Sequence, residues 1–282
     1  MKIQSVGHWL IGGAVLLVGC GPKAIPEGSE SATTESESIQ STSAESESSE
    51  AASVADEPSE DPAVVEFTLP NLGEQLTALS TKNKEMMPAE IVQVFVDGIK
   101  EVQGTGIVEA ALSAGAEAFD GELPDANGNT VKLSDLWAKG PVVVVWYRGG
   151  WCPYCNLQLQ AMQEALPAIK AKGGTLVAIT PETPDNSLST VEKNELEFVV
   201  LSDVGNELAK KYGVVFKLPE KVSPIYKKMI DLAKYNGNDS DELPLAATYV
   251  INQTGKITYA FLDANYTKRA EPADIVAALE AL

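Results

Sequence analysis

Two cysteines separated by two residues carry the clearest chemistry in this sequence. They are Cys152 and Cys155, in the stretch Tyr147-Arg148-Gly149-Gly150-Trp151-Cys152-Pro153-Tyr154-Cys155. A zinc site would need two further ligands, but the only other cysteine is Cys20 and the only histidine is His8, both near the N-terminus. The spacing therefore favours reversible thiol and disulfide chemistry over metal binding or an inert structural disulfide.

The residues around Cys152 predict the elements that position its thiol. Val142 to Trp146 is an unbroken apolar run, which predicts a strand buried on both faces, and Gly149-Gly150 predicts a turn. A long amphipathic helix is expected next, with Pro153 in its first turn and Gly173-Gly174 at its end. Cys152 would then lie at a helix N-terminus, where unpaired N–H groups and the helix dipole favour a thiolate.

These positions suggest a role for each side chain. Cysteines at helix N-termini can have pKa values of roughly 3.5 to 7.5, so Cys152 is expected to be the nucleophile. Cys155 lies on the same helix face, within reach for a disulfide, and is expected to be the resolving thiol. We expect Trp151 to shield the sulfur from water and Arg148 to place a positive charge beside the thiolate or an oxyanion.

The first residues predict a targeting signal. Lys2 supplies a positive charge, and residues 9–18 form an apolar run that is too short to span a membrane. The following Leu17-Val18-Gly19-Cys20 resembles the lipobox of bacterial lipoproteins, in which cleavage precedes a cysteine that is then lipidated. This resemblance implies a signal peptide over residues 1–19. An ordinary secreted protein with a chance cysteine is the alternative.

Lipidation of Cys20 would hold the mature protein on a membrane, because two or three acyl chains together anchor a protein stably. Gly21 rather than aspartate follows Cys20, which resembles the sorting of Gram-negative lipoproteins to the outer membrane. We therefore expect an extracytoplasmic protein, lipid-anchored to the periplasmic face of a bacterial outer membrane.

A segment rich in serine and glutamate follows the predicted lipid anchor. Stretches such as Ser36-Glu37-Ser38 cannot bury enough apolar surface to offset their conformational entropy, and their like charges repel. We expect residues 20–62 to be a disordered tether. Much of the formal net charge of −19 lies in this segment, and so acidic a chain is not expected to bind nucleic acid.

Residues 63–115 predict a helical arm. Leucines recur at helical spacing in its first part, Pro88 begins a second apolar-striped segment, and Thr105 is expected to cap a third, short helix that ends at Ala114. We expect this arm to pack on the catalytic domain rather than to form a separate module that binds a partner.

Residues 116–282 alternate between predicted strands and helices. The expected elements are a hairpin over 123–133, strands at 142–146, 175–180 and 198–201, helices following each strand at 153–173, 184–194 and 206–212, a further helix over 223–234, a hairpin over 247–262 and a last helix over 272–282. Helical crossovers require parallel strands. A hairpin and a helix after such a unit form the thioredoxin arrangement. The expected fold is therefore α/β and thioredoxin-like, with a central mixed sheet flanked by helices.

Residues 116–282 also resemble the peroxiredoxin-like family of alkyl hydroperoxide reductase and thiol-specific antioxidant proteins (AhpC/TSA). The resemblance rests on Leu123-Pro124-Asp125, on Tyr147 to Cys155, on Leu201-Ser202-Asp203 with residues 209–214, and on residues 248–252 with Gly255-Lys256-Ile257. It implies that Cys152 attacks the O–O bond of a hydroperoxide, becomes a sulfenic acid and condenses with Cys155 to a disulfide. A thioredoxin-type reductant would restore the dithiol, and no cofactor is required.

The same resemblance implies supporting roles for the residues next to the cysteines. Arg148 and nearby backbone N–H groups would hold the peroxide oxygens and stabilise the leaving oxyanion. The supporting or substrate-binding residues expected on this basis are Tyr147, Arg148, Trp151 and Pro153.

A membrane-tethered thiol–disulfide oxidoreductase, acting on protein disulfides, is the alternative. Trp-Cys-x-x-Cys is the thioredoxin pattern, and Cys-Pro-Tyr-Cys is also the glutaredoxin sequence. The chain carries Val145 and Gly149 where typical peroxiredoxins have a proline and a threonine or serine. A redox-inert binding or scaffold protein is a third possibility, and the two intact cysteines argue against it.

Overall fold

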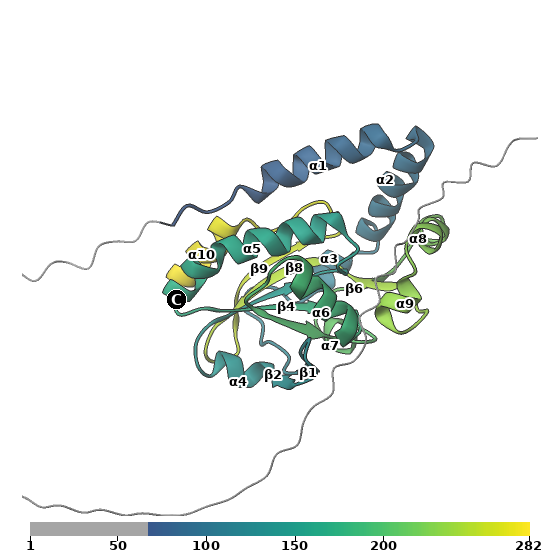
Figure 1. Ribbon diagram of the computed structural model, residues 1–282. Coiled ribbons are helices and arrows are strands. Elements are labelled where there is room, and N and C mark those ends of the chain that lie inside the picture. Colours follow the sequence, from purple (N-terminus) through teal and green to yellow (C-terminus); the bar gives the residue numbers. More distant parts are fainter. Residues whose placement is uncertain (1–66) are drawn as a thin grey trace, which may run out of the picture. The chain divides into compact units, whose positions relative to one another are not determined.

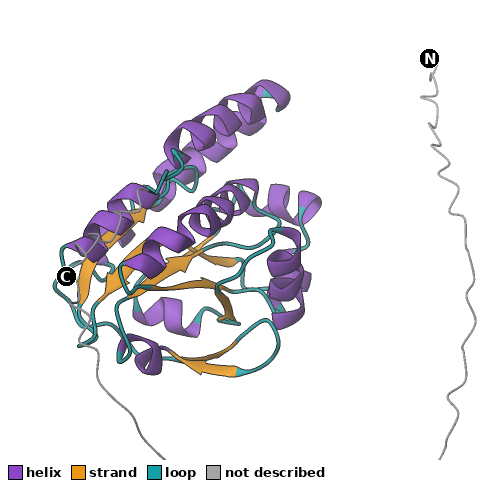
Figure 2. Cartoon of the chain, turned by 60° about the vertical axis from the view of Figure 1, so that its left-hand side comes forward, coloured by secondary structure: helices purple, strands orange, loops and turns teal. Residues whose placement is uncertain are grey.

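A five-stranded mixed sheet forms the centre of the protein. The computed structural model describes residues 67–282, so the predicted signal peptide, Cys20 and tether lie outside the described residues. The strand order is β5-β4-β3-β8-β9. Strands β3 (Val142–Trp146), β4 (Thr175–Thr180) and β5 (Val199–Ser202) are parallel, whereas β8 (Ala246–Ile251) and β9 (Ile257–Asp263) form an antiparallel pair, and β8 also runs antiparallel to β3. Figure 2 shows the strands in orange among the purple helices.

Helices cover both faces of this sheet (Figure 1). Val143 and Val145 of β3 pack into one core together with α5 (Pro153–Ala171) and α10 (Pro272–Glu280). Val142 and Val144 point to the opposite core, as alternation along a strand requires. The elements of that second face include the hairpin of β1 (Glu122–Pro124) and β2 (Thr130–Lys132) and the helices α4 (Leu133–Trp137) and α7 (Glu207–Lys211). The layers confirm the predicted thioredoxin-like fold.

The segment predicted as a helical arm forms α1 (Leu72–Met86), α2 (Ala89–Gln103) and α3 (Ile107–Ala110). Helix α1 lies over α5, with Leu72 and Leu76 buried in the same core (Figure 1). The Glu271 carboxylate, which precedes α10, accepts hydrogen bonds from the N–H groups of Leu72 at 3.0 Å and Gly73 at 2.6 Å. A carboxylate at this position satisfies the first N–H groups of α1 and complements its dipole, so it fastens the arm to the C-terminal helix.

The third arm helix differs from its prediction. It begins after Gly106, whose φ of +74° suits glycine, and it ends at Ala110 rather than at Ala114. The predicted cap, Thr105, was wrong by one residue, because Gly106 is the residue that precedes the first helical turn. The Thr105 hydroxyl still accepts a hydrogen bond from the Ile107 N–H at 3.3 Å.

The helix predicted over residues 223–234 is broken into two. Helix α8 (Ser223–Met229) stops because Ile230 is extended, and α9 (Leu232–Asn236) begins after Asp231, whose carboxylate accepts from the Lys234 N–H at 3.2 Å. A separate two-stranded antiparallel sheet pairs β6 (Val215–Lys217) with β7 (Glu242–Pro244), on either side of α8 and α9, and was not predicted. The remaining helix, α6 (Pro184–Lys193), packs against β5.

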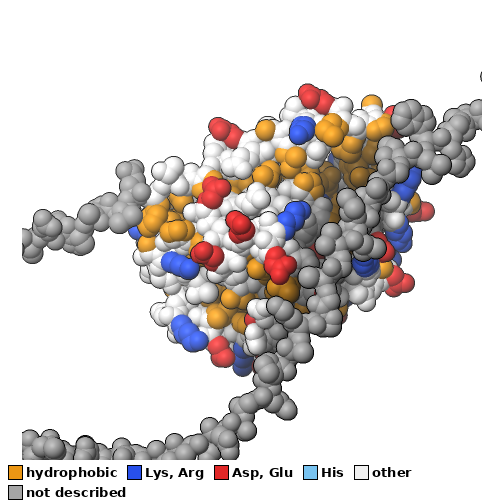
Figure 3. Space-filling view, viewed as in Figure 1, with side chains coloured by type: hydrophobic (Ala, Val, Ile, Leu, Met, Phe, Trp, Pro, Cys, Tyr) orange, Lys and Arg blue, Asp and Glu red, His pale blue; other side chains and the backbone are white. Residues whose placement is uncertain are grey.

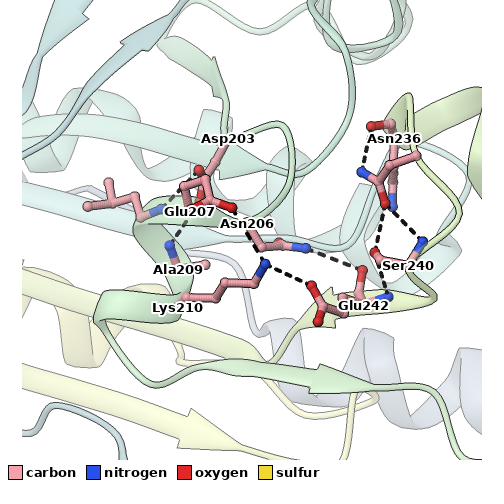
Figure 4. A network of polar contacts seen from close by, with 10 residues as sticks. Asp203, Asn206, Glu207, Ala209, Lys210, Asn236, Ser240 and Glu242 are labelled. Carbon is pink, nitrogen blue, oxygen red and sulfur yellow. Dashed lines mark hydrogen bonds and ion pairs between the residues drawn. The ribbon is translucent and has the colours of Figure 1, made fainter.

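The stretch Leu201-Ser202-Asp203 has a structural role at the end of β5 (Figure 4). The buried Asp203 carboxylate accepts hydrogen bonds from the N–H groups of Leu208 at 3.0 Å and Ala209 at 2.9 Å, in the first turns of α7. On the same helix, Lys210 pairs with Glu242 of β7 at 3.0 Å. These contacts fix the start of α7 to the end of β5 and link α7 to β7.

Candidate active site

The structure places Cys152 at the N-terminus of α5, directly after the turn that leaves β3. Cys152 is the N-cap residue, and its sulfur accepts a hydrogen bond from the Cys155 N–H at 3.4 Å. Pro153 occupies the first helical position, where its missing N–H removes no helix bond. Both sulfur-bearing side chains are 0% exposed, so the thiols lie beneath the surface of the reduced protein.

Close packing explains the two glycines before Cys152. Gly149 has a φ of +148°, and a Cβ atom there would overlap the Trp151 indole and lie 2.9 Å from a Glu182 oxygen. A Cβ atom on Gly150 would overlap the Thr190 hydroxyl. The position at which typical peroxiredoxins carry a threonine or serine therefore has no room for a side chain in this protein.

Arg148 lies against the sulfur of Cys152. Its Nη2 is 3.3 Å from Cys152 Sγ, and its Nη1 donates a hydrogen bond to the Tyr226 hydroxyl at 2.7 Å. The guanidinium carbon lies 4.0 Å from the ring centre of Tyr266 and 5.2 Å from that of Trp151. Because Arg148 is only 3% exposed, these aromatic faces replace much of the water that would otherwise solvate its charge.

A second arginine lies against the other sulfur. Arg269, in the segment between β9 and α10, places its Nη2 3.3 Å from Cys155 Sγ and donates from Nε to Gln158 Oε1 at 2.6 Å. Its Nη1 donates to the carbonyl oxygens of Tyr266 and Lys268. No sequence pattern indicated Arg269, which is 114 positions from Cys155 in the chain.

The two thiols are electrostatically unequal. Burial alone would raise the pKa of Cys152, but the hydrogen bond from Cys155 and the charges of Arg148 and Arg269 hold it well below the ordinary cysteine pKa. Burial and the adjacent Cys152 raise the pKa of Cys155, and the two arginines offset this only in part. The surroundings thus favour the thiolate at Cys152 over that at Cys155, the order that a nucleophile and its resolving thiol would need.

A buried carboxylate lies behind the glycine turn. Both oxygens of Glu182, which is 0% exposed, lie 3.0 Å from the Gly150 nitrogen. Burial raises the pKa of Glu182 to about 7, although the Gly150 N–H opposes this shift. Its position just after β4 could have indicated from the sequence that Glu182 lies near the thiols, because the carboxyl ends of neighbouring parallel strands meet at one edge of a sheet.

Tyr147 and Trp151, both expected to support the site, take different positions. Tyr147 is fully buried in the core that contains both cysteines, and burial, followed by the charge of Glu182, raises its pKa well above the ordinary value. Trp151 is half-buried, packs against the same core and lines the approach to Arg148. Tyr147 therefore supports the turn from within, whereas Trp151 and the exposed Pro153 face the approach.

The helical arm forms one wall of this approach. A pocket of about 240 Å³ reaches Arg148, and its lining includes Met87 and Phe95 from the arm and Met229 and Ile230 from the α8–α9 region. Asn83 of α1 donates to the Tyr154 hydroxyl at 3.2 Å, which links the arm directly to the cysteine-bearing helix. Hydrophobic side chains gather over α1 and α2 on the face drawn in Figure 3.

Residues 67–282 contain neither a metal-binding cluster nor a helix fit for a membrane. In this part of the chain, no group of three or more His, Cys, Asp or Glu side chains could hold a metal ion. No described helix is both long and apolar enough to cross a membrane.

A thioredoxin-like fold with a thiol pair at the start of α5 defines a thiol-dependent oxidoreductase. The chain belongs to the AhpC/TSA family, whose profile matches residues 114–260. This assignment confirms the family resemblance of the sequence, and the relatives below are peroxiredoxins and thiol–disulfide oxidoreductases, which are enzymes.

Two relatives represent the thiol–disulfide oxidoreductases and the peroxiredoxins. The thiol–disulfide oxidoreductase ResA of Bacillus thuringiensis subsp. konkukian is 31% identical over 119 residues, which cover 42% of this chain and 68% of the relative. The chloroplastic peroxiredoxin Q of Triticum aestivum is 27% identical over 162 residues, which cover 57% of this chain and 64% of the relative.

Solved structures support the fold alone. A cysteine-to-serine mutant of the peroxiredoxin 6 of Arenicola marina superimposes with a TM-score of 0.50 at 16% identity, covering 60% of this chain and 72% of that one.

Proposed function

We propose that this protein is a thiol peroxidase that reduces hydroperoxides at Cys152. The contact between Arg148 Nη2 and Cys152 Sγ, at 3.3 Å and at a helix N-terminus, carries this proposal. A buried guanidinium here stabilises the attacking thiolate, and it is also placed to stabilise the oxyanion that leaves when the O–O bond breaks.

The reaction proceeds in two steps on the protein. The Cys152 thiolate attacks one oxygen of the hydroperoxide, the O–O bond breaks, and the departing alkoxide or hydroxide takes up a proton to leave a sulfenic acid on Cys152. The Cys155 sulfur then attacks Cys152 Sγ, loses its proton and expels water, which closes the disulfide. A thioredoxin-type dithiol supplies the two electrons that reopen it.

Disulfide exchange with a protein substrate is the second candidate function. The ResA relative favours it, as does Gly149, which leaves no hydroxyl beside Cys152 to orient a peroxide. Glu182 also favours it, because a buried carboxylate with a pKa of about 7 can exchange a proton with its surroundings at neutral pH.

Stopped-flow kinetics of the reduced full chain separate the two candidates. Trp151 lies near the thiols, so tryptophan fluorescence reports their oxidation by hydrogen peroxide, and a protein disulfide is tested in parallel. Oxidation by peroxide far faster than that of free cysteine supports the peroxidase. Slow reaction with peroxide and fast exchange with the protein disulfide would instead identify a thiol–disulfide oxidoreductase.

We also propose that lipidation of Cys20 anchors the protein to the periplasmic face of a bacterial outer membrane. The lipobox-like Leu17-Val18-Gly19-Cys20 and the acidic, serine-rich segment that follows support this location. Replacing Cys20 with serine should release the chain from the membrane fraction. Unchanged membrane association of the Cys20→Ser variant would refute the lipid anchor.

A further inference from the structure

A second groove lies between α1 and the residues that follow β9. Its volume is about 340 Å³, and we name it the Arg269 groove. One side is the face of α1 from Gly73 to Lys84, and the other includes Phe261 and the segment Thr267-Lys268-Arg269. This volume lies within the range of small-molecule sites, roughly 300 to 1,000 Å³.

The polar groups of this groove suit an anion. Lys84, Lys268 and Arg269 line it together with four hydroxyl side chains, and none of the residues that line it carries a carboxylate. Two carboxylates contact residues of its lining: Asp263 lies 3.6 Å from Lys268 Nζ, and Glu271, at the Gly73 end, accepts a hydrogen bond from the Gly73 N–H at 2.6 Å.

Arg269 connects this groove to the resolving cysteine. The side chain lines the groove and is 6% exposed, while its Nη2 lies 3.3 Å from Cys155 Sγ. Arg148 has the corresponding place on the other approach, since it lines the pocket beside Met87 and contacts Cys152. Each sulfur therefore has its own arginine, and each arginine faces a different opening.

We propose that the Arg269 groove binds a small thiol bearing carboxylate groups, and that this thiol reduces the Cys152–Cys155 disulfide by attack at Cys155. The inference rests on the part of the proposed function in which that disulfide forms. It adds a second reductant, of a different chemical class, and an entrance separate from the one used by the substrate.

The direction of attack follows from the leaving group. A thiolate that attacks Cys155 Sγ breaks the disulfide and expels Cys152 as a thiolate, at the helix N-terminus and beside Arg148. Exchange is faster when the departing thiol has the lower pKa, and Cys152 has the lower pKa of the pair. A second small thiolate then attacks the sulfur of the bound thiol and releases Cys155. Two thiols thus become one small disulfide, and the protein gains two electrons.

The kinetic test compares glutathione with its diethyl ester, which has the same thiol but no free carboxylates. The full chain is oxidised with diamide, and its reduction is followed by stopped-flow fluorescence at equal thiolate concentrations. We expect faster reduction by glutathione, and a loss of roughly two- to fivefold for each of Lys84→Gln and Lys268→Gln, as for exposed charge pairs. The ester rate should not change in these variants.

Lys139→Gln is the matched control, because Lys139 is an exposed lysine between α4 and β3, at the end of the sheet away from the thiols. It should leave both rates unchanged. Equal rates for glutathione and the ester in the unaltered protein would overturn the groove as a carboxylate site.

Mapping the mixed disulfide tests the position of attack. Rapid acid quenching, alkylation and fragment mass spectrometry of the peptide that contains both cysteines should find glutathione on Cys155 and alkyl label on Cys152. Glutathione on Cys152 instead would overturn the proposal.

Diamide also separates this proposal from the peroxidase. If diamide forms the disulfide and peroxide does not, the peroxidase proposal is refuted. The groove proposal is then still tested by comparing the reduction rates with glutathione and with its ester. If diamide forms no Cys152–Cys155 disulfide, both are refuted.

Discussion

Arg148 Nη2 lies 3.3 Å from Cys152 Sγ, and the same guanidinium donates from its other side to the Tyr226 hydroxyl at 2.7 Å. Tyr226 belongs to α8, which lies outside the strands and helices of the central sheet. The segment between β6 and β7 thus holds the arginine that contacts Cys152. The site therefore depends on this segment as well as on the residues around the two cysteines.

Replacing Arg148 with glutamine should raise the pKa of Cys152. An adjacent opposite charge lowers the pKa of an acid by roughly 1 to 3 units, so its loss should raise the Cys152 pKa by a similar amount. Thiolate absorbance measured against pH reports this change directly. Arg148→Lys keeps the charge, so its Cys152 pKa should lie between that of the unaltered protein and that of Arg148→Gln. A Cys152 pKa unchanged in Arg148→Gln would contradict the role of this contact.

The two cysteines should differ when each is replaced by serine. Cys152→Ser should abolish reaction with peroxide and with disulfides, because it removes the attacking sulfur and leaves only Cys155, which is fully buried. Cys155→Ser should leave a sulfenic acid or a mixed disulfide trapped on Cys152. Dimedone labelling detects the sulfenic acid, and mass spectrometry without reductant detects the mixed disulfide. The reverse pattern would exchange the roles of nucleophile and resolving thiol.

A side chain at position 149 should destabilise the protein. Gly149→Ala strains a residue with a φ of +148° and forces the new Cβ into the Trp151 indole. Gly128→Ala is the matched control, since Gly128 has a φ of +84° but no other atom lies within 4 Å of the place its Cβ would take. Overpacking should make the first variant less stable than the second by roughly 1 to 3 kcal/mol in urea denaturation. Equal losses would show that the space around Gly149 is not limiting.

Glu182 should make stability depend on pH. Its pKa rises from 4.5 to about 7 on folding, so the folded state binds more protons than the unfolded state between these values. The stabilisation is complete below pH 4.5 and is lost as the pH rises through about 7. Relative to Glu182→Gln, the free energy of unfolding should therefore fall by about 3 kcal/mol over this range. Parallel pH profiles for the two proteins would argue against a buried, protonated Glu182.

Local sequence patterns predicted the strand and the helix on either side of the site. The apolar run at Val142–Trp146 forms β3 with the predicted bounds, because four valines and a tryptophan in sequence favour a strand buried on both faces. Pro153 then begins α5, since proline fits the first turn of a helix. The break between α8 and α9 was missed because the Asp231 cap interrupts a segment that otherwise has helical composition.

Long-range partners of the thiols could not be predicted in this way. Arg269 is 114 positions from Cys155, and Tyr226 is 78 positions from Arg148. Neither residue belongs to a periodic pattern or a motif. Nothing in the neighbouring sequence indicates that the arginine contacts a sulfur or that the tyrosine contacts a guanidinium group. Glu182 had a weak signal in its place after β4.

The sequence alone determined that Cys152 and Cys155 lie together at the start of a helix, because strand, turn and helix start are encoded by neighbouring residues. Only the tertiary structure decided that Arg148 and Arg269 each contact one sulfur and that Glu182 lies beneath the turn. The physical reason is that the arginine charges which lower the Cys152 pKa act through space. Arg269 and Glu182 come to the thiols only when the sheet brings β4 and the segment after β9 to the same end of β3.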